Sequence, residues 1–267
     1  MLPPLRPTLP APTAELDLPG RRRSLQALLG LGAALSLRVA DAAKPGQLRL
    51  VSTEFPPYTS ARLEGGGIAV QITRAALARQ GWGLELHFRP WVRALSELQR
   101  GAWDGAVCLW HSPDRDRFLS YGRPLGLSNR IGFMARAGSA ISVREPSRLA
   151  GLRVGTVRDY VNPPAFERLR LERDEAVDDL GNLRKLLAGR VDLALVDQGV
   201  AHHLLQTQLR EAATALVWLE PALAEQPLYT ALSRQASMHL PMLNKGLAEL
   251  QTSGELARLL QRSARWL

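Results

Sequence analysis

Short apolar runs alternate with amphipathic segments along most of the chain. In the first half, apolar runs of strand length lie at 48–52, 84–88 and 104–110. Between the first two runs, Ile68, Ile72 and Ala76 recur at the spacing of one helix face. A second helix is predicted over 91–100. This alternation is the signature of βαβ units, in which parallel strands form a sheet that helices cover.

A second cycle of the same alternation follows a polar connector at 137–148. Its pattern predicts strands at 152–156, 176–178, 191–196, 215–219 and 229–233. Helices are predicted from Pro163 onward and at 182–188, 238–251 and 254–264. Two α/β cycles indicate two compact lobes, and 267 residues are sufficient for both.

The chain is predicted to pass between the lobes twice, near Ala135 and near Thr230. This assigns residues 43–136 and 231–267 to lobe 1, and residues 137–230 to lobe 2. Two such connections form a hinge, and a cleft between two lobes is where ligands usually bind. The expected function is therefore ligand binding in a cleft.

The first 42 residues have the features of an export signal. Arg21–Arg23 precede an apolar segment at 25–37, and Ala40-Asp41-Ala42 matches an A-x-A cleavage site. The consecutive arginines resemble a twin-arginine signal, and the general secretion route fits equally well. An uncleaved membrane anchor is the alternative, but no apolar run approaches the roughly 20 residues that span a bilayer. We expect a mature protein that begins near Ala43, in the periplasm.

Charge and composition exclude several other classes. The formal net charge is +9, but Arg and Lys are scattered among Asp and Glu, so nucleic acid is not expected as a partner. Cys108 is the single cysteine, which excludes an internal disulfide and a CxxC metal site, and its apolar neighbours predict a buried core thiol. The five histidines show no metal-binding spacing, and His203 is expected to face solvent. No metal or cofactor is expected.

Seven short motifs occur in a fixed order between residues 47 and 261. They are Glu54-Phe55-Pro56-Pro57-Tyr58, Gly67, Leu98-x-x-Gly101-x-x-Asp104, Ser112-Pro113-Asp114-Arg115, Tyr121-Gly122-x-Pro124, Leu149-x-Gly151-x-x-Val154-Gly155 and Gly189-Arg190-Val191-Asp192-Leu193-Ala194-Leu195-Val196-Asp197. None is specific alone, but in this order the sequence resembles the family 3 extracellular solute-binding proteins, the polar amino-acid binders of bacterial ABC transporters. The resemblance implies an α/β, two-lobed, periplasmic-binding-protein-like (type II) clamp with a hinge between the lobes.

The resemblance also implies charged ligand contacts in both lobes. Arg115, three residues after Ser112, matches the family's arginine that binds the ligand's α-carboxylate with its planar fork of donors. A surface arginine paired with Asp114 or Asp116 is the alternative. Asp197 matches the family's aspartate that binds the ligand's ammonium group, and it is also suited to cap the helix that follows it.

Aromatic side chains complete the site that the resemblance implies. Phe55 matches the family's stacking aromatic, and Trp91 lies where the family usually has a hydrophobic pocket wall. Tyr58 and Trp110 are expected near the mouth of the cleft. Cys108 and Trp110 replace small residues of the third strand. We therefore expect a narrower and more apolar site, and a ligand other than an ordinary amino acid stays open.

The loop after the first strand of lobe 2 departs from the family pattern. Its sequence, Gly155-Thr156-Val157-Arg158-Asp159-Tyr160, replaces the Gly-Ser or Gly-Thr turn whose backbone N–H groups bind the carboxylate in the family. Thr156 and Arg158 are expected to substitute in part for that turn.

Taken together, these patterns predict an exported solute-binding protein and not an enzyme. It would capture an amino acid or related carboxylate by hinge closure and deliver it, as a monomer, to a membrane ABC permease. An enzyme similar to the exported cyclohexadienyl dehydratases is one alternative, with Glu54 or His111 as acid or base, although no partner that would orient His111 is identified. A stand-alone sensor domain is the other alternative.

Overall fold

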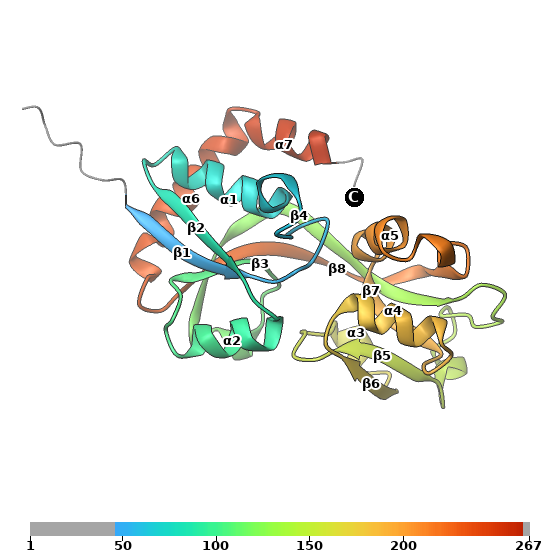
Figure 1. Ribbon diagram of the computed structural model, residues 1–267. Helices are drawn as coiled ribbons and strands as arrows, with labels where there is room; N and C mark the ends of the chain where they lie inside the picture. Colours follow the sequence, from blue (N-terminus) through green and yellow to red (C-terminus); the bar gives the residue numbers. More distant parts are fainter. Residues whose placement is uncertain (1–45, 264–267) are drawn as a thin grey trace, which may run out of the picture. The chain divides into compact units, whose positions relative to one another are not determined.

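The computed structural model describes residues 46–263 (Figure 1). The predicted export signal at 1–42 lies outside the described residues. Within 46–263, no helix combines the length and the apolar character that a membrane crossing requires. Residues 46–263 contain the strands of both predicted α/β cycles.

In the described residues, eight strands form one mixed sheet in the order β2-β1-β3-β8-β4-β7-β5-β6. The strands are β1 Gln47–Ser52, β2 Gly83–Phe88, β3 Gly105–Leu109, β4 Leu119–Arg136, β5 Arg153–Val157, β6 Glu172–Ala176, β7 Leu193–Asp197 and β8 Leu216–Ser233. The α-helices are α1 Ile68–Ala78, α2 Trp91–Gln99, α3 Pro164–Glu167, α4 Asp179–Leu187, α5 Gln198–Thr207, α6 Leu240–Thr252 and α7 Glu255–Ser263. Among the 3-10 helices between them, η2 Pro113–Arg115 contributes to the site. The predicted α/β class is confirmed.

Two long strands, β4 and β8, connect the two halves of the sheet. β1 pairs in parallel with β2 and β3, and β5 pairs in parallel with β6 and β7. β8 lies antiparallel beside β3, and β4 lies antiparallel beside β7. Each of the two is 18 residues long, so the chain crosses between the halves twice. This is the two-lobed arrangement expected from the sequence, while the residue limits given for each lobe stay a prediction.

Helices cover both faces of the strands in lobe 1. Leu50 of β1 lies in a buried cluster with Ile72 of α1 and Leu247 of α6. Val51, its neighbour, lies in another cluster with Leu98 of α2. Successive side chains of a strand point to opposite faces, so α1 and α6 cover one face and α2 covers the other (Figure 1). Burial on both faces explains why these strands are continuous apolar runs.

Two strands differ from the prediction. Residues 216–219 and 229–233 belong to one continuous strand, β8, and β4 is not among the predicted strands. Pro221 and Pro227 lie inside β8, although proline normally marks a strand edge or a turn. Pro124 interrupts the pattern of β4 in the same way. The pairing of β4 with β8 accommodates these prolines through register shifts.

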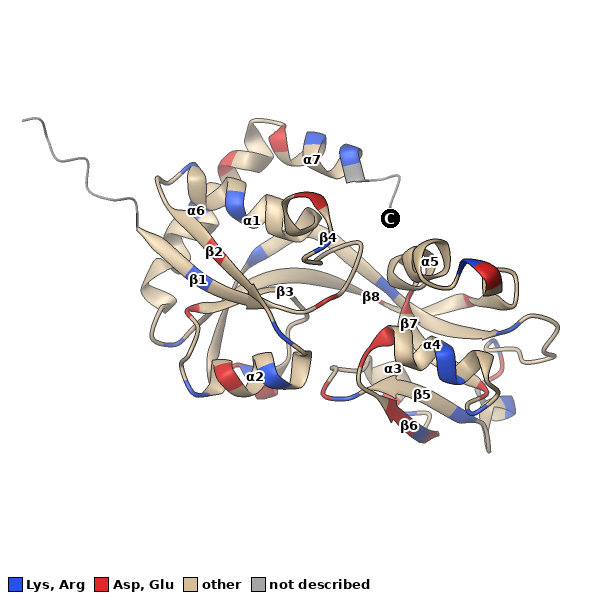
Figure 2. Ribbon diagram, viewed as in Figure 1, with Lys and Arg blue, Asp and Glu red and all other residues tan. Residues whose placement is uncertain are grey.

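The strand predicted at 176–178 lies earlier, at 172–176. Its Glu-Arg-Asp-Glu-Ala sequence is mostly charged (Figure 2), and it pairs only with β5, at the edge of the sheet. A charged edge strand lacks the apolar alternation by which strands are identified. The helix that follows, α4, begins three residues earlier than predicted. The reason is that Asp178 caps it by accepting a 2.7 Å hydrogen bond from the Gly181 N–H.

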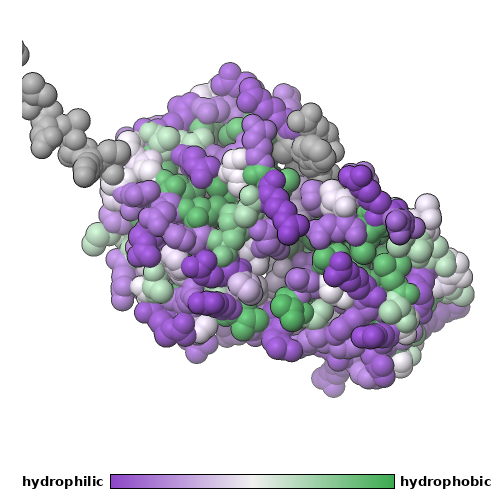
Figure 3. Space-filling model, viewed as in Figure 1, coloured by the Kyte–Doolittle hydropathy of each residue, from purple (hydrophilic) through white to green (hydrophobic). Residues whose placement is uncertain are grey.

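Charged side chains are spread over the described part of the chain. Lys and Arg are interspersed with Asp and Glu along its helices and strands (Figure 2). Hydrophilic side chains predominate on the face drawn in Figure 3, with apolar areas between them. Arg153 and Glu172, 3.0 Å apart, form one of the ion pairs that this mixture allows.

His203 corrects one expectation about the surface. It is buried on α5, with 9% of its surface exposed, and not directed to solvent. It lies one helical turn after Val200, which is also buried, so both residues share the inner face of the helix. Burial lowers the pKa of His203.

Candidate functional site

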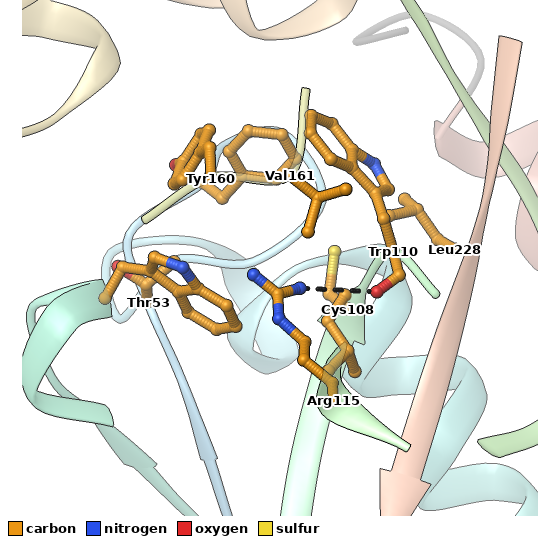
Figure 4. Close-up of a pocket in the computed structure, with 10 residues that line it drawn as sticks. Thr53, Cys108, Trp110, Arg115, Tyr160, Val161 and Leu228 are labelled. Atoms are coloured by element: carbon orange, nitrogen blue, oxygen red, sulfur yellow. Dashed lines mark hydrogen bonds between the residues drawn. The ribbon is translucent and has the colours of Figure 1, made fainter. Parts of the chain in front are cut away.

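Segments that follow β1, β3 and β5 converge on a cavity (Figure 4). In parallel sheets, the carboxyl ends of the strands are where ligand sites form. The cavity is lined by Thr53, Phe55, Trp91, Cys108, Leu109, Trp110, Arg115, Tyr160, Val161 and Leu228. Its volume is about 30 Å³, room for about one or two water molecules. One guanidinium group therefore lies among mostly apolar and aromatic walls.

Arg115 is held in this cavity by backbone carbonyl groups. The residue ends η2, is 6% exposed, and directs its guanidinium group into the cavity (Figure 4). Nη1 donates a 3.3 Å hydrogen bond to Trp110 O, and Nη2 donates a 3.0 Å hydrogen bond to Asp159 O. Its Cζ lies 4.9 Å from the centre of the Trp91 ring, a cation–π distance.

The charge of Arg115 has no ion-pair partner within the described residues. Burial lowers the pKa of its guanidinium group, but an arginine stays charged at any physiological pH. The alternative of a surface arginine paired with Asp114 or Asp116 is wrong, because Arg115 is buried and Asp116 pairs with His111. The negative charge of Asp159 acts on Arg115 without forming an ion pair with it. A buried charge that lacks a direct ion pair is costly, so the cavity favours an anionic group.

Three aromatic rings of lobe 1 surround Tyr160 of lobe 2. The Tyr160 ring centroid lies 6.1 Å from that of Phe55, 6.4 Å from that of Trp91 and 5.9 Å from that of Trp110. All three pairs are T-shaped, an arrangement that the aromatic quadrupoles favour. The structure thus brings the predicted walls Phe55, Trp91 and Trp110 together, around a residue that is not in the predicted set. Their contacts with a ligand stay predictions.

Asp197 lies at the end of β7 and lines a second, smaller cavity. It is 2% exposed, and its Oδ1 accepts a 2.9 Å hydrogen bond from the Val200 N–H, so its role as helix cap is confirmed. Its Oδ2 forms no hydrogen bond within the described residues. Burial raises the pKa of Asp197 to about 7. The Tyr58 hydroxyl and the backbone N–H groups of Arg130 and Gly199 lie near this carboxylate and act to lower its pKa. A cationic group of a ligand would therefore join a carboxylate that is already surrounded by donors.

Asp179 is a second buried carboxylate in this smaller cavity. It is 5% exposed, and its Oδ2 accepts a 3.1 Å hydrogen bond from the Tyr160 hydroxyl. Burial raises the pKa of Asp179 to about 7, and the negative charges of Asp197 and Asp178 act in the same direction. Tyr160 lines both cavities. A cationic side with Arg115 and an acidic side with two aspartates thus meet at the aromatic cluster, which suits a zwitterion.

Tyr58 supports the site without lining either cavity in the described residues. It is 3% exposed, and its ring stacks on Phe55 with 5.5 Å between the centroids. Burial and the negative charge of Asp197 raise the pKa of Tyr58, so its hydroxyl stays protonated. A direct ligand contact of Tyr58 stays a prediction.

Ser112, Thr156 and Arg158 also lie outside the linings of these two cavities, as far as the described residues extend. Ser112 is buried where η2 begins, and Thr156 is buried within β5. Arg158 is exposed and forms a 3.3 Å ion pair with Glu175. Their ligand contacts stay predictions, which the geometry does not support.

Three further residues, Tyr160, Asp179 and Cys108, line the cavities although none of them is in the predicted set of site residues. Tyr160 follows β5 at its carboxyl end, a position that points to ligand sites in any parallel sheet. Asp179 directly follows Asp178, whose position is typical of a helix cap. The sequence therefore gives no separate indication that the Asp179 carboxylate belongs to the site. Cys108 is buried as expected, but it also lines the first cavity, where burial raises the pKa of its thiol.

Glu54 and His111 lie outside the linings of both cavities in the described residues. His111 Nε2 lies 3.0 Å from Asp116 Oδ1, so the expectation that it lacks an orienting partner is wrong. Both side chains of this pair are about half exposed. Glu54 accepts a hydrogen bond from the Ala61 N–H. Within 46–263, no cluster of three or more His, Cys, Asp or Glu residues is arranged to hold a metal ion.

A sheet whose halves are joined by two long strands, with a cavity at the strand ends, defines a two-lobed ligand-binding protein. The chain belongs to the bacterial extracellular solute-binding proteins, family 3, whose family model matches residues 49–265. The resemblance in the sequence motifs is thereby confirmed. A comparison with curated protein sequences gives no match.

Solved structures share the fold at low sequence identity. A histidine kinase sensor domain with similarity to periplasmic binding proteins aligns with a TM-score of 0.72 and 23% identity, over 84% of this chain and 97% of that chain. The GluR0 ligand-binding core from Nostoc punctiforme, in complex with L-glutamate, gives 0.67 and 17%, over 80% and 98%. The substrate-binding protein of an amino acid ABC transporter gives 0.69 and 19%, over 81% and 98%. These similarities establish the two-lobed fold.

Proposed function

We propose that this protein binds a small zwitterion, an amino acid or a related carboxylate, by closing its two lobes around it. The observation that carries the proposal is the buried guanidinium group of Arg115, which points into the cavity and has no ion-pair partner in the described residues. A carboxylate matches the planar fork of this group and neutralises its charge. The ligand's carboxylate therefore binds Arg115.

The ligand's ammonium group binds Asp197. Its Oδ2 is buried and forms no hydrogen bond within the described residues. A neighbouring cation favours the ionised carboxylate and offsets the burial that raises the pKa of Asp197. Phe55 and Trp110 line both cavities, so the ligand's carbon skeleton lies along their rings. Because Arg115 and Asp197 belong to different lobes, one ligand bridges the two.

Uptake of such a ligand requires the lobes to move apart. The cavity beside Arg115 has a volume of about 30 Å³, room for about one or two water molecules and too small for an amino acid. β4 and β8, the two strands that connect the lobes, are the proposed hinge. The ligand binds the open form and stabilises the closed one by its contacts with both lobes.

We place the protein in the periplasm, as a monomer that delivers its ligand to a membrane ABC permease. Membership in the extracellular solute-binding family supports this role, as does the shared fold of an amino acid transporter's binding protein. No catalytic step is proposed, since Glu54 and His111 do not line the two cavities.

A sensor role is the second candidate, because a histidine kinase sensor domain also has this fold. Uptake of a radiolabelled ligand in cells with and without the gene separates the two roles. The transport role requires lower uptake in the deletion strain. Unchanged uptake, together with a ligand response in transcription that the deletion abolishes, would favour the sensor.

Binding itself is tested by thermal unfolding of the purified protein with each of the common L-amino acids, small carboxylates and polyamines. A ligand at 100 times its Kd stabilises the folded state by about 2.7 kcal/mol, which raises the Tm of a protein of this size by about 5 to 10 °C. Arg115→Ala is expected to abolish the shift. Arg158→Ala, an exposed arginine outside both cavities, is the matched control and is expected to preserve it. A full shift in Arg115→Ala would refute the assigned role of Arg115.

A further inference from the structure

One backbone carbonyl oxygen of lobe 2 accepts hydrogen bonds from two side-chain donors of lobe 1. Asp159 O accepts a 3.0 Å hydrogen bond from Trp91 Nε1 and a 3.0 Å hydrogen bond from Arg115 Nη2. The two donors belong to different elements, α2 and η2, yet they converge on a single oxygen. A carboxylate oxygen of a ligand would receive the same two hydrogen bonds.

The next residue, Tyr160, fills the aromatic box, by which we mean Phe55, Trp91 and Trp110. Its ring makes T-shaped contacts with all three, and its hydroxyl donates to Asp179 on the acidic side. The Asp159 carbonyl contacts Arg115 at one end of the site, and the Tyr160 hydroxyl contacts Asp179 at the other. The Tyr160 ring lies between these two contacts. Asp159 and Tyr160 together therefore reproduce the contacts proposed for a ligand.

The backbone of this loop presents the two residues as a unit. Asp159 has a φ of 60°, in the left-handed region that residues other than glycine seldom adopt. The Arg158 N–H donates to Ala176 O, and the Tyr160 N–H donates to Val157 O, so the turn is anchored to the sheet. Contacts with lobe 1 offset the cost of the unusual backbone conformation.

We propose that Asp159 and Tyr160 form an internal plug that takes the ligand's place on lobe 1, holds the lobes together, and must be displaced before a ligand binds. The proposal rests on the ligand site proposed at Arg115. A plug of this kind lowers the apparent affinity by the fraction of molecules in which the site is free. It therefore sets the ligand concentration at which the protein begins to respond.

The single cysteine of the chain allows a test without any ligand. Cys108 is 8% exposed and lines the same cavity as Tyr160. We would measure the rate at which Ellman's reagent modifies Cys108 in the full-length protein. Tyr160→Ala is expected to increase this rate at least about tenfold, because the plug no longer limits opening of the cavity. Arg158→Ala, in the same loop, is expected to react like the wild type. Tyr160→Phe keeps the ring and loses only the hydrogen bond to Asp179, so it is expected to react more slowly than Tyr160→Ala. Equal rates in Tyr160→Ala and the wild type would overturn the proposal.

A distance measurement tests whether the plug also holds the lobes together. Val92 on α2 and Val177 after β6 are 40% and 66% exposed and line one surface groove. Spin labels at Val92→Cys and Val177→Cys, in a Cys108→Ser background, report their separation by pulsed EPR. Without added ligand we expect one short distance, and a broader distribution with longer distances after Tyr160→Ala. Identical distributions would overturn the proposal.

Trp91→Phe provides a second variant that keeps an aromatic ring. It removes only one of the two donors to Asp159 O, so a smaller increase in both readouts is expected. Circular dichroism confirms that each variant is folded. Neither measurement uses a ligand, so a failure of the plug proposal can be distinguished from a failure of the proposed binding function. If no compound shifts the Tm of either the wild type or Tyr160→Ala, the proposed binding function is wrong. The Cys108 modification rates and the spin-label distances still test the plug in that case.

Discussion

The Tyr160 hydroxyl donates a 3.1 Å hydrogen bond to Asp179 Oδ2, which joins the loop after β5 to the first turn of α4. The carboxylate that accepts it is 5% exposed. The charges of Asp197 and Asp178 disfavour its ionised form, whereas the hydrogen bond from Tyr160 favours it. The stability of the folded protein therefore depends on this contact and on pH.

Tyr160→Phe removes the donor and keeps the ring. We expect the free energy of unfolding to fall by about 2 kcal/mol at pH 8 and by about 1 kcal/mol at pH 5, because a hydrogen bond to an ionised carboxylate is the stronger one. Urea denaturation at both pH values measures the difference. Tyr229→Phe is the control, since Tyr229 contacts Tyr121 through its ring. An equal loss at the two pH values would contradict the assigned charge state of Asp179.

The pH dependence of stability follows from the two buried aspartates. Burial raises the pKa of both Asp179 and Asp197 to about 7 in the folded protein, against about 3.9 in an unfolded chain. Between these values the folded state holds more protons than the unfolded state. The free energy of unfolding is therefore expected to fall as the pH rises from 4.5 to 7, by on the order of 3 kcal/mol for each aspartate, and to level off above 7.

Asp179→Asn isolates one of these groups. The variant keeps an acceptor for Tyr160 and removes the charge, so it is expected to lose roughly half of the pH dependence and to exceed the wild type in stability at pH 8. Glu97 and Glu167, whose pKa values are lowered by hydrogen bonds from Arg93 and Arg173, titrate below this window. His203, whose pKa is lowered by burial, titrates inside the window and opposes the two aspartates, but it is a single group with a smaller shift. Urea unfolding at half-unit steps from pH 4.5 to 8.5 measures both proteins. Stability that rises with pH in the wild type would show that the aspartates are not buried as described.

The local pattern of apolar residues predicts the strands that are buried on both faces. β1, β3 and β7 lie within one or two residues of their predicted limits, because parallel strands covered by helices are apolar throughout. β6 was displaced because it is a charged edge strand, and β4 was missed because Pro124 interrupts it. These features depend on the position of a strand in the sheet, which a local window does not contain.

The residues of the site likewise fall into those that the sequence predicts and those that it does not. Arg115 and Phe55 follow motifs that the family resemblance identifies, and both line the cavity. The contact of Tyr160 with Asp179 depends on how a loop after β5 packs against α4, 19 residues further along the chain. No spacing rule relates these two positions. The plug geometry depends further on the left-handed backbone of Asp159, which its sequence does not indicate.

Close packing of α1 against α6 gives a prediction about stability alone. A Cβ atom at Gly246 would overlap the carbonyl oxygen of Ala76, which is backbone and cannot turn aside. Gly246→Ala is expected to lower the free energy of unfolding by about 1 to 3 kcal/mol. At Gly83 the nearest atom would lie at 3.6 Å, an ordinary contact, so Gly83→Ala should stay within about 0.5 kcal/mol of the wild type. Similar losses in both variants would argue against this helix packing.

Asp197 has two roles that one pair of substitutions separates: it caps α5, and it is proposed to bind the ligand's ammonium group. Asparagine is as good a helix cap as aspartate, so Asp197→Asn should be at least as stable as the wild type at pH 8. It lacks the charge, so the affinity for the tightest amino acid found by thermal unfolding should fall at least about tenfold, or about 1.4 kcal/mol.

Asp197→Ala loses both roles, and its stability should fall below that of Asp197→Asn by about 1 kcal/mol. Asp178→Asn is the matched control, because Asp178 caps α4 by the same contact and lines neither of the two cavities. Isothermal titration calorimetry and urea unfolding on the four proteins give the two quantities independently. If Asp197→Asn binds as tightly as the wild type, Asp197 is a helix cap alone, and the ammonium group must be bound by Asp179, which then becomes the residue to substitute.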